Sequence, residues 1–230
     1  MAVSATAANY SSILWQTNGD GTFSNAVLLN PVYYPGVLDI ETSSVVLTIS
    51  VSSINPCAGS VNDFLTLTIM RQQLIQIPAG WSGLSSYVQP LNPAFDQVMA
   101  PIANNLIVAK NMMLVYWPEF GINTIGNFDP AKGYLVKMNA AATLPINGFE
   151  FANKTLNLPA GWNILPVISS VNVSYQELIT QLGNKLVIVT EIAGTGIIWP
   201  DEGIYTIPFL VPGKAYMIKL TSPGTFTFPD

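Results

Sequence analysis

Short apolar runs, separated by turn residues, give the first part of the chain a strand-like pattern. The runs are rich in β-branched and aromatic residues, and segments such as Asn18-Gly-Asp-Gly21 stand between them. Such runs, bounded by Gly, Pro and Asn, are typical of β-strands. The first 70 residues are therefore expected to form a small sandwich of four or five strands. The predicted strands lie at 12–17, 28–33, 45–53 and 64–70.

The rest of the chain is an internal duplication. Between 117–138 and 199–220, 10 of 22 positions are identical. Conserved order and spacing of this kind indicate two copies of one structural unit. The matching motifs are Ile77-Pro-Ala-Gly-Trp81 with Leu158-Pro-Ala-Gly-Trp162, Trp117-Pro-Glu with Trp199-Pro-Asp, and Pro130-Ala-Lys-Gly-Tyr134 with Pro212-Gly-Lys-Ala-Tyr216.

Each copy has the pattern of a small α+β module. In the second copy, Ser174 and Glu177 form a capping box that begins a helix, and Gly183 ends it. In the first copy, Asn92 is expected to cap a helix with Pro93 at its first position, and Pro101 to end it. Strands are predicted at 74–81, 106–109 and 143–146, at the matching 155–162, 186–189 and 225–228, and on the Trp-Pro and Lys-x-Tyr segments.

The predicted fold class is mainly β. The first part suggests a partial immunoglobulin-like (Ig-like) sandwich, since a complete one has about seven strands. Two homologous small β-rich (α+β) repeat modules follow. We expect these modules to pack as a pseudo-symmetric pair, because neither is large enough for a generous core of its own. The predicted domains are 1–72, 73–152 (module 1) and 153–230 (module 2).

Composition excludes several classes of protein. Half of the 230 residues are hydrophobic and 9% are charged, so a disordered chain is excluded. The eight Lys and Arg residues are scattered between Arg71 and Lys219 and form no basic patch, which argues against nucleic-acid binding. No run of 18 apolar residues predicts a membrane span. The absence of histidine removes Ser-His-Asp triads, Cys-His pairs and nearly all zinc sites.

Charge is scarce and uneven. Residues 1–70 contain four acids and no Lys or Arg, and the first basic residue is Arg71, which suggests a domain boundary there. Soluble domains average about 25% charged residues, so 9% is low. This scarcity suits a protein whose faces are covered by neighbouring copies or modules. The same scarcity equally suits an ordinary secreted β protein, and both interpretations stay open.

The aromatic motifs have a structural and a binding interpretation. Tryptophan beside Gly and Pro usually fills the core of a small module. Exposed Trp and Tyr rings instead stack on sugars. We assign Trp81 and Trp162 to the cores, with Gly80 and Gly161 as turn residues. The candidate ligand-binding residues are Trp117, Trp199, Tyr116, Tyr134 and Tyr216.

No catalytic site is predicted. Glu119 and Asp201 occupy equivalent repeat positions, and nothing supplies the second opposed carboxylate that a glycosidase needs. The Asn18–Gly21 loop lacks the spacing of an EF-hand and is explained as a hairpin turn. Ca²⁺ remains an alternative there, with Asp20, Asp39 and Glu41 as ligands; otherwise no cofactor is expected. Cys57, the only cysteine, is interpreted as structural: an orphan of a missing strand or a buried thiol.

Two resemblances add an expectation about function. Ala8–Phe23, Leu29–Tyr33 and Val45–Ile49 resemble the Ig-like repeats of secreted Bacteroidetes surface proteins, in which a leading strand precedes the match. Residues 73–228 are similar to the "PAGW…GYxIK" repeats of secreted bacterial and archaeal surface proteins, although Ala215 replaces their usual Gly. Both imply an extracellular, non-enzymatic surface module.

We therefore expect a structural or adhesive module, not an enzyme, of an extracellular or cell-surface protein. Without a leading strand, the sandwich has an open edge that another chain's strand can fill by β-augmentation. Such strand exchange predicts self-association into filaments, or association with neighbouring modules of the same protein. The alternatives are a carbohydrate-binding module with a glycan partner, and an accessory domain of a larger secreted enzyme. Residues 1–10 lack the features of a signal peptide, so either the protein is cytoplasmic or its native beginning is absent.

Overall fold

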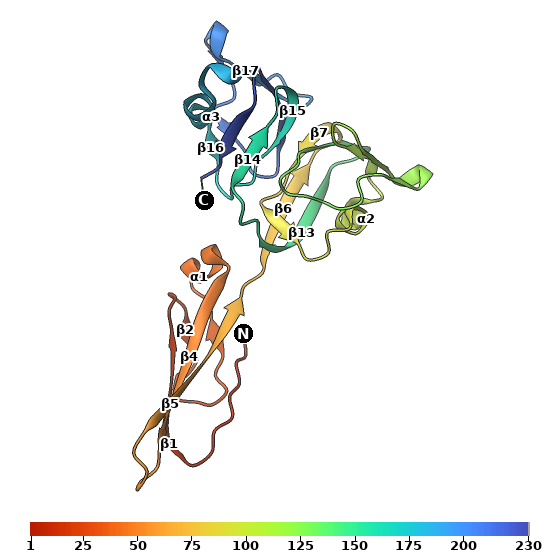
Figure 1. Ribbon diagram of the computed structural model, residues 1–230. Helices are drawn as coiled ribbons and strands as arrows, with labels where there is room; N and C mark the ends of the chain where they lie inside the picture. The colour runs from red at the N-terminus through yellow and green to blue at the C-terminus, as the bar shows by residue number, and fades with distance from the viewer. Residues whose placement is uncertain (230) are drawn as a thin grey trace. The chain divides into compact units, whose positions relative to one another are not determined.

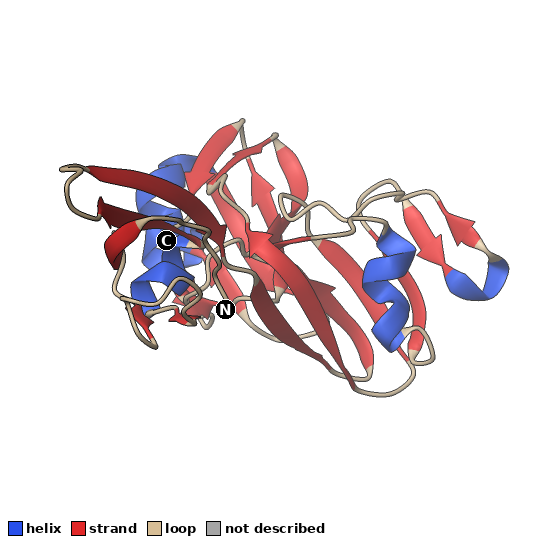
Figure 2. Cartoon of the chain, turned by 90° about the horizontal axis from the view of Figure 1, so that it is seen from below, coloured by secondary structure: helices blue, strands red, loops and turns tan. Residues whose placement is uncertain are grey.

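The computed structural model describes residues 1–229, and strands dominate it (Figures 1 and 2). Strands make up 48% and helices 14%, so the fold is mainly β, as predicted. Tertiary contacts divide the chain into unit 1, Met1–Arg71, and unit 2, Gln72–Asp230. Unit 1 has one hydrophobic core and unit 2 has two, one for each repeat. Within 1–229, no helix is long and apolar enough to cross a membrane.

Unit 1 is built on an antiparallel sheet of three long strands, in the order β1-β4-β5. Period-two alternation places Ile13 and Trp15 of β1, and Val45, Leu47 and Ile49 of β4, in the core. The elements of unit 1 are β1 (Tyr10–Thr17), β2 (Thr22–Phe23), β3 (Tyr33–Tyr34), α1 (Val37–Thr42), β4 (Ser44–Ser53) and β5 (Ser60–Thr68).

Residues 1–8, called the arm from here on, lie beside 29–33. Val3 N–H donates to Pro31 O at 3.1 Å, and Ala5 N–H donates to Leu29 O at 3.2 Å. Of the predicted strand at 28–33, only Tyr33 belongs to a regular strand, β3. The arm therefore supplies an extended leading segment where the sequence suggested that none was present.

Module 1 of unit 2 contains a five-stranded sheet, β11-β10-β9-β12-β7, and a three-stranded sheet, β6-β13-β8. The helix begins at Phe95, two residues after the predicted Pro93, and Pro101 lies in the short 3-10 helix that follows. The elements are β6 (Arg71–Ile77), β7 (Gly80–Leu84), β8 (Val88–Pro90), α2 (Phe95–Met99), η1 (Ala100–Ile102), β9 (Leu106–Lys110), β10 (Val115–Trp117), η2 (Pro118–Phe120), β11 (Ile122–Asn123), β12 (Tyr134–Met138) and β13 (Ala142–Glu150).

Module 2 repeats this order: its five-stranded sheet is β15-β21-β17-β18-β19. Its helix begins after Ser174 and Gly183 follows its last residue, as predicted, but the Ser174 Oγ accepts the N–H of Gln176 and not that of Glu177 expected for a capping box. The elements are β14 (Thr155–Leu158), β15 (Gly161–Pro166), β16 (Val173–Ser174), α3 (Tyr175–Leu182), η3 (Gly183–Lys185), β17 (Leu186–Glu191), β18 (Ile197–Trp199), η4 (Pro200–Glu202), β19 (Ile204–Tyr205), β20 (Phe209–Leu210), β21 (Ala215–Leu220) and β22 (Gly224–Thr227).

The two modules contact each other through equivalent positions. Gly83 of β7 lies against the Ala215 backbone of β21, and Gly133 lies against Ile164 of β15. In the repeat alignment Gly83 corresponds to Ile164, and Gly133 corresponds to Ala215. The same two repeat positions therefore meet twice, with their roles exchanged between the modules. This is the pattern of an isologous contact. The modules thus pack around a local pseudo-two-fold relation.

A buried serine adds polar contacts to this interface. Ser85 is fully buried, and its Oγ accepts the N–H of Val167 at 3.1 Å and donates to Lys214 O. Ser85 N–H in turn donates to Gly213 O at 3.0 Å. Because a buried donor without a partner destabilises a fold, these bonds hold β7 of module 1 in a defined place beside module 2.

Candidate functional site

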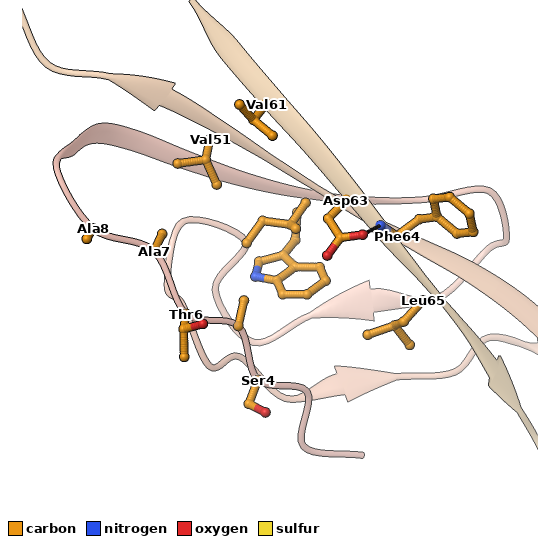
Figure 3. Close-up of a pocket in the computed structure, with 12 residues that line it drawn as sticks. Ser4, Thr6, Ala7, Ala8, Val51, Val61, Asp63, Phe64 and Leu65 are labelled. Carbon is orange, nitrogen blue, oxygen red and sulfur yellow. Dashed lines mark hydrogen bonds between the residues drawn. The ribbon is translucent and has the colours of Figure 1, made fainter.

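The candidate site is a groove in unit 1, between the arm and the sheet (Figure 3). Its volume is about 640 Å³. Ser4–Ala8 form one wall, and residues of β4 and β5 form the other. Trp15, Ile49 and Val51 add an apolar lining from the core side. The groove exists because the arm, β2 and β3 cover only part of the inner face of the sheet.

The strand that borders this groove, β5, is an edge strand with exposed apolar side chains. It pairs with β4 along nine residues, and no strand among residues 1–229 pairs with its other edge. Val61 is 73% exposed and Phe64 is 71% exposed. A long edge strand with apolar side chains is a template for pairing with another chain. We call this strand and its groove the open edge.

One acidic side chain lies in the groove. The Asp63 carboxylate faces the groove from β5, and its Oδ1 accepts the N–H of the next residue, Phe64, at 2.9 Å (Figure 3). Charged residues that point inward are one of the ways in which natural sheets limit unwanted edge pairing. Asp63 therefore limits which strands can pair with the open edge. A partner strand must either donate a hydrogen bond to the Asp63 carboxylate or leave that carboxylate in contact with water.

The tryptophans are distributed differently from the sequence prediction. Trp15 is buried at 3% exposure, but Trp81 and Trp162 are 37% and 44% exposed. The prediction that these two fill the cores is wrong. Each instead lies opposite a lysine on the next strand, Lys137 and Lys219, with the ammonium 5.9 Å from the indole centroid. The repeated Trp and Lys therefore form cation–π pairs on the sheet surfaces.

The predicted ligand-binding aromatics divide into two groups. Trp117 is 37% exposed beside Phe120, and Trp199 is half-buried. Tyr116, Tyr134 and Tyr216 are buried, so their assignment to a binding surface is wrong. Desolvation by burial raises the pKa of all three above the ordinary tyrosine value.

Tyr134 and Tyr216 are structural residues of the repeat. The Tyr134 hydroxyl accepts the N–H of Asp129 at 2.8 Å, and the Tyr216 hydroxyl accepts the N–H of Val211 at 3.1 Å. Each tyrosine lies five residues after the residue that donates to it, so its hydroxyl bonds the preceding loop to the core of its module. The repeated glycines are also structural: Gly80 and Gly161 have φ of +88° and +86°, which favour glycine.

The acids proposed for Ca²⁺ have other roles. Asp39 is buried and accepts the Tyr33 hydroxyl at 2.6 Å and the Gly36 N–H at 3.0 Å. Asp20 accepts the N–H groups of Leu38 and Asp39 at the start of α1, and the Leu38 bond lowers the pKa of its carboxyl. Glu41 is not grouped with them: residues 1–229 contain no cluster of three or more Asp, Glu, His or Cys side chains suited to a metal. The predicted ligand set is therefore wrong.

Cys57 lies in the loop between β4 and β5 and is exposed, with a free thiol. The alternative of a buried thiol is therefore wrong. The loop instead uses backbone groups of Cys57: its N–H donates to Ile54 O at 3.0 Å, and its carbonyl accepts the Ser53 hydroxyl at 2.9 Å. The thiol thus takes no part in holding unit 1 together.

A second concave surface lies between the two modules of unit 2. This cleft has a volume of about 460 Å³ and includes Trp81, Gln76 and Lys214. Lys214 Nζ is 3.7 Å from Glu191 Oε1, and Glu191 also lines the cleft. The combination of an indole, an amide and an ion pair supplies both a stacking surface and hydrogen-bonding groups.

Fold and groove together define a mainly β chain with an incompletely covered sheet in unit 1 and a duplicated module in unit 2. Comparison with known protein families, with curated proteins and with solved structures finds no match to this chain. The two resemblances drawn from the sequence motifs therefore stay predictions.

Proposed function

We propose that this chain is a non-catalytic structural module that assembles with copies of itself by β-strand addition in unit 1. The observation that carries the proposal is the open edge, where nine residues of β5 have a free outer side next to an apolar groove. A strand that enters it gains main-chain hydrogen bonds from β5 and apolar contacts in the groove. The extracellular setting is proposed from the resemblance of the repeats to secreted surface proteins.

The scarcity of charge supports this proposal. Charged residues at strand edges usually keep sheets apart, and β5 has only Asp63 among its nine residues. Val61 and Phe64 expose large apolar surfaces that a neighbouring strand would remove from water. At about 25 cal/mol per Å², burial of such side chains favours association by a few kcal/mol.

The substitution Val61→Lys is expected to weaken assembly and leave the fold unchanged. Val61 is mostly exposed and lines the groove, so a lysine there places an ammonium group where an incoming strand would lie. We expect the mass of the assemblies, measured by light scattering after size exclusion, to fall toward the 24.8 kDa of one chain. Electron microscopy of the same fractions should show shorter or no fibres.

Val27→Lys is the matched control. Val27 is in the same unit, is 59% exposed and lies outside the groove, and its substitution adds the same charge. It should assemble like the wild type. Equal assembly of both variants, or a wild type that is a monomer at all concentrations, would contradict strand addition at the open edge.

A second candidate function is carbohydrate binding in the cleft between the modules. Trp81 supplies an exposed indole there, and Gln76, Glu191 and Lys214 supply hydrogen-bonding groups, a common combination for sugar rings. A glycan that binds is expected to quench the tryptophan fluorescence, and Trp81→Ala should abolish that response. Trp162→Ala, which removes the equivalent indole outside this cleft, should keep it. No response to a broad glycan panel would rule this candidate out.

A further inference from the structure

The arm packs against the rest of unit 1 in the manner of a β-strand. Its side chains alternate in burial: Val3 is buried, Ala5 and Ala7 are half-buried, and the residues between them are exposed. Its backbone is held by 29–33, since Val3 N–H donates to Pro31 O and Tyr33 N–H donates to Met1 O. We call residues 29–33, with the core surface beneath the arm, the seat. The seat is thus complementary to an eight-residue segment of this same sequence.

The connection between the arm and the sheet has the properties of a hinge. Asn9 has a φ of +56° and reverses the chain between the arm and β1, which begins at Tyr10. The hydrogen bonds of the arm go to 29–33, whereas β1 is held by β4 along its length. A change of φ and ψ at Asn9 therefore moves the arm away and leaves the three-stranded sheet intact.

Charge also permits the arm to enter another copy. Unit 1 has four acids before Arg71 and no other Lys or Arg, so two copies of its body repel one another. The arm, Met1–Ala8, contains no charged side chain. Its apolar contacts come from Val3 and alanines. An arm that enters a second copy thus adds no charged side chain to its acidic body.

We propose that the strand exchanged in the assembly is the arm: in each contact, the arm of one copy opens at Asn9 and occupies the seat of a second copy. The inference rests on the proposed self-assembly, names the donor strand, and places the acceptor at the seat, a surface separate from the outer side of β5. Exchange of an identical element keeps every contact of the closed form, so it is a low-cost route to association.

The reach of the arm fits this arrangement. Eight extended residues span about 26 Å at 3.3 Å per residue. When Asn9 is extended, the arm continues in the direction of β1, beyond the end of its own sheet. Such a contact is head-to-tail, and a head-to-tail contact that does not close into a ring produces an open filament. Because the exchanged arm restores the wall formed by Ser4–Ala8, the groove and the outer edge of β5 stay as they are in the closed form.

A disulfide between the arm and the seat tests the proposal. Ala2 and Val32 form an antiparallel bridge, and the hydrogen bonds on either side of it make them a non-hydrogen-bonded pair, with Cα atoms about 4.5 Å apart. This separation is suitable for a disulfide, and both side chains are exposed. The variant is Ala2→Cys/Val32→Cys in a Cys57→Ser background, which removes the free thiol.

Two measurements follow. Oxidised after assembly, the variant should run on non-reducing gels as a ladder of dimers and larger multiples of 24.8 kDa, because the cysteines of different copies are paired. Oxidised as a dilute monomer, it should lock its own arm, fail to assemble, and recover assembly when the disulfide is reduced. A control pair across β1 and β4, Leu14→Cys/Ser50→Cys, should give only intramolecular disulfides in both cases.

The possible outcomes separate this inference from the proposed function. Assemblies whose arm disulfides are all intramolecular, or a locked monomer that still assembles, would overturn arm exchange and leave strand addition at the open edge of β5 as the route of assembly. Absence of assembly under all conditions would overturn both. A ladder together with assembly that is restored by reduction supports both.

Discussion

Trp15→Ala is expected to lower the free energy of unfolding of unit 1 by about 3–5 kcal/mol, the usual cost of deleting a buried large aromatic ring. The ring is 3% exposed, contacts Phe23 at a centroid separation of 5.9 Å, and donates its Nε1–H to Leu28 O at 3.0 Å. Alanine leaves both a cavity and a carbonyl without its donor. Calorimetry should show the transition of unit 1 shifted to lower temperature and that of unit 2 unchanged.

Trp117→Ala is the matched control for this prediction. It makes the same chemical change, but the ring is 37% exposed on a hairpin of unit 2, so the surrounding structure loses little burial. Its effect should be below about 1 kcal/mol, in the range of surface substitutions. Equal effects of the two substitutions would show that Trp15 is not a core residue of unit 1.

The duplication was the most predictable part of the fold. Residues with a strong local conformational preference mark the ends of their elements well: Ser174 is the N-cap of α3, and Gly183 follows its last residue. The apolar runs at 106–109 and 186–189 are indeed strands. By contrast, β7 and β15 were not predicted. Their sequences, such as Gly80-Trp-Ser-Gly-Leu84, contain glycine and serine because their faces meet the other module, which removes the usual alternation.

The burial of aromatic residues could not be derived from their repetition. Trp81 and Tyr134 recur equally in the two modules, yet Trp81 is exposed and Tyr134 is buried. On β12, Lys137 is the cross-strand partner of Trp81, so the face that carries lysines also carries the indole. A period-two count from Lys137 places Tyr134 on the opposite face. The sequence therefore contained the signal for burial: the positions of the lysines indicate which face of the strand is exposed.

The sequence predicted an open edge for a different reason, the absence of a leading strand, whereas in the structure the arm is present and the free edge is that of β5. The small number of strands before Arg71 indicates an incomplete sandwich, whereas the arm was not recognised as a leading segment. Its inward positions are one valine and two alanines, which give a weak hydrophobic alternation. Only the tertiary structure shows that such small side chains suffice, because Val3 and Ala5 pack on a core already formed by Trp15 and Tyr33.

The contact between the modules gives the second large expected effect. In Gly83→Ala, the new Cβ would lie 2.1 Å from Ala215 O and 2.7 Å from its carbonyl carbon. Both atoms belong to the backbone of β21, which β15 and β17 hold on either side, so neither can move alone. Overpacking of this kind costs about 1–3 kcal/mol or more. The Tm of unit 2 should fall by about 2–4 °C for each kcal/mol.

Gly133→Ala provides an internal comparison at the reciprocal contact. There the added Cβ would meet the Ile164 side chain at 2.3 Å, and its next contacts are at 3.1 Å. Only one atom, a side-chain methyl, would lie closer than 3.0 Å there, whereas three backbone atoms of Ala215 lie that close in Gly83→Ala, so this substitution should destabilise unit 2 less. No effect of either substitution would show that the modules do not pack through these positions, and the reverse order would show that the β21 backbone yields more easily than the Ile164 side chain. If Gly83→Ala destabilises unit 2 more than Gly133→Ala does, the two modules form one folded unit, because a single methyl group at their contact then lowers the stability of both.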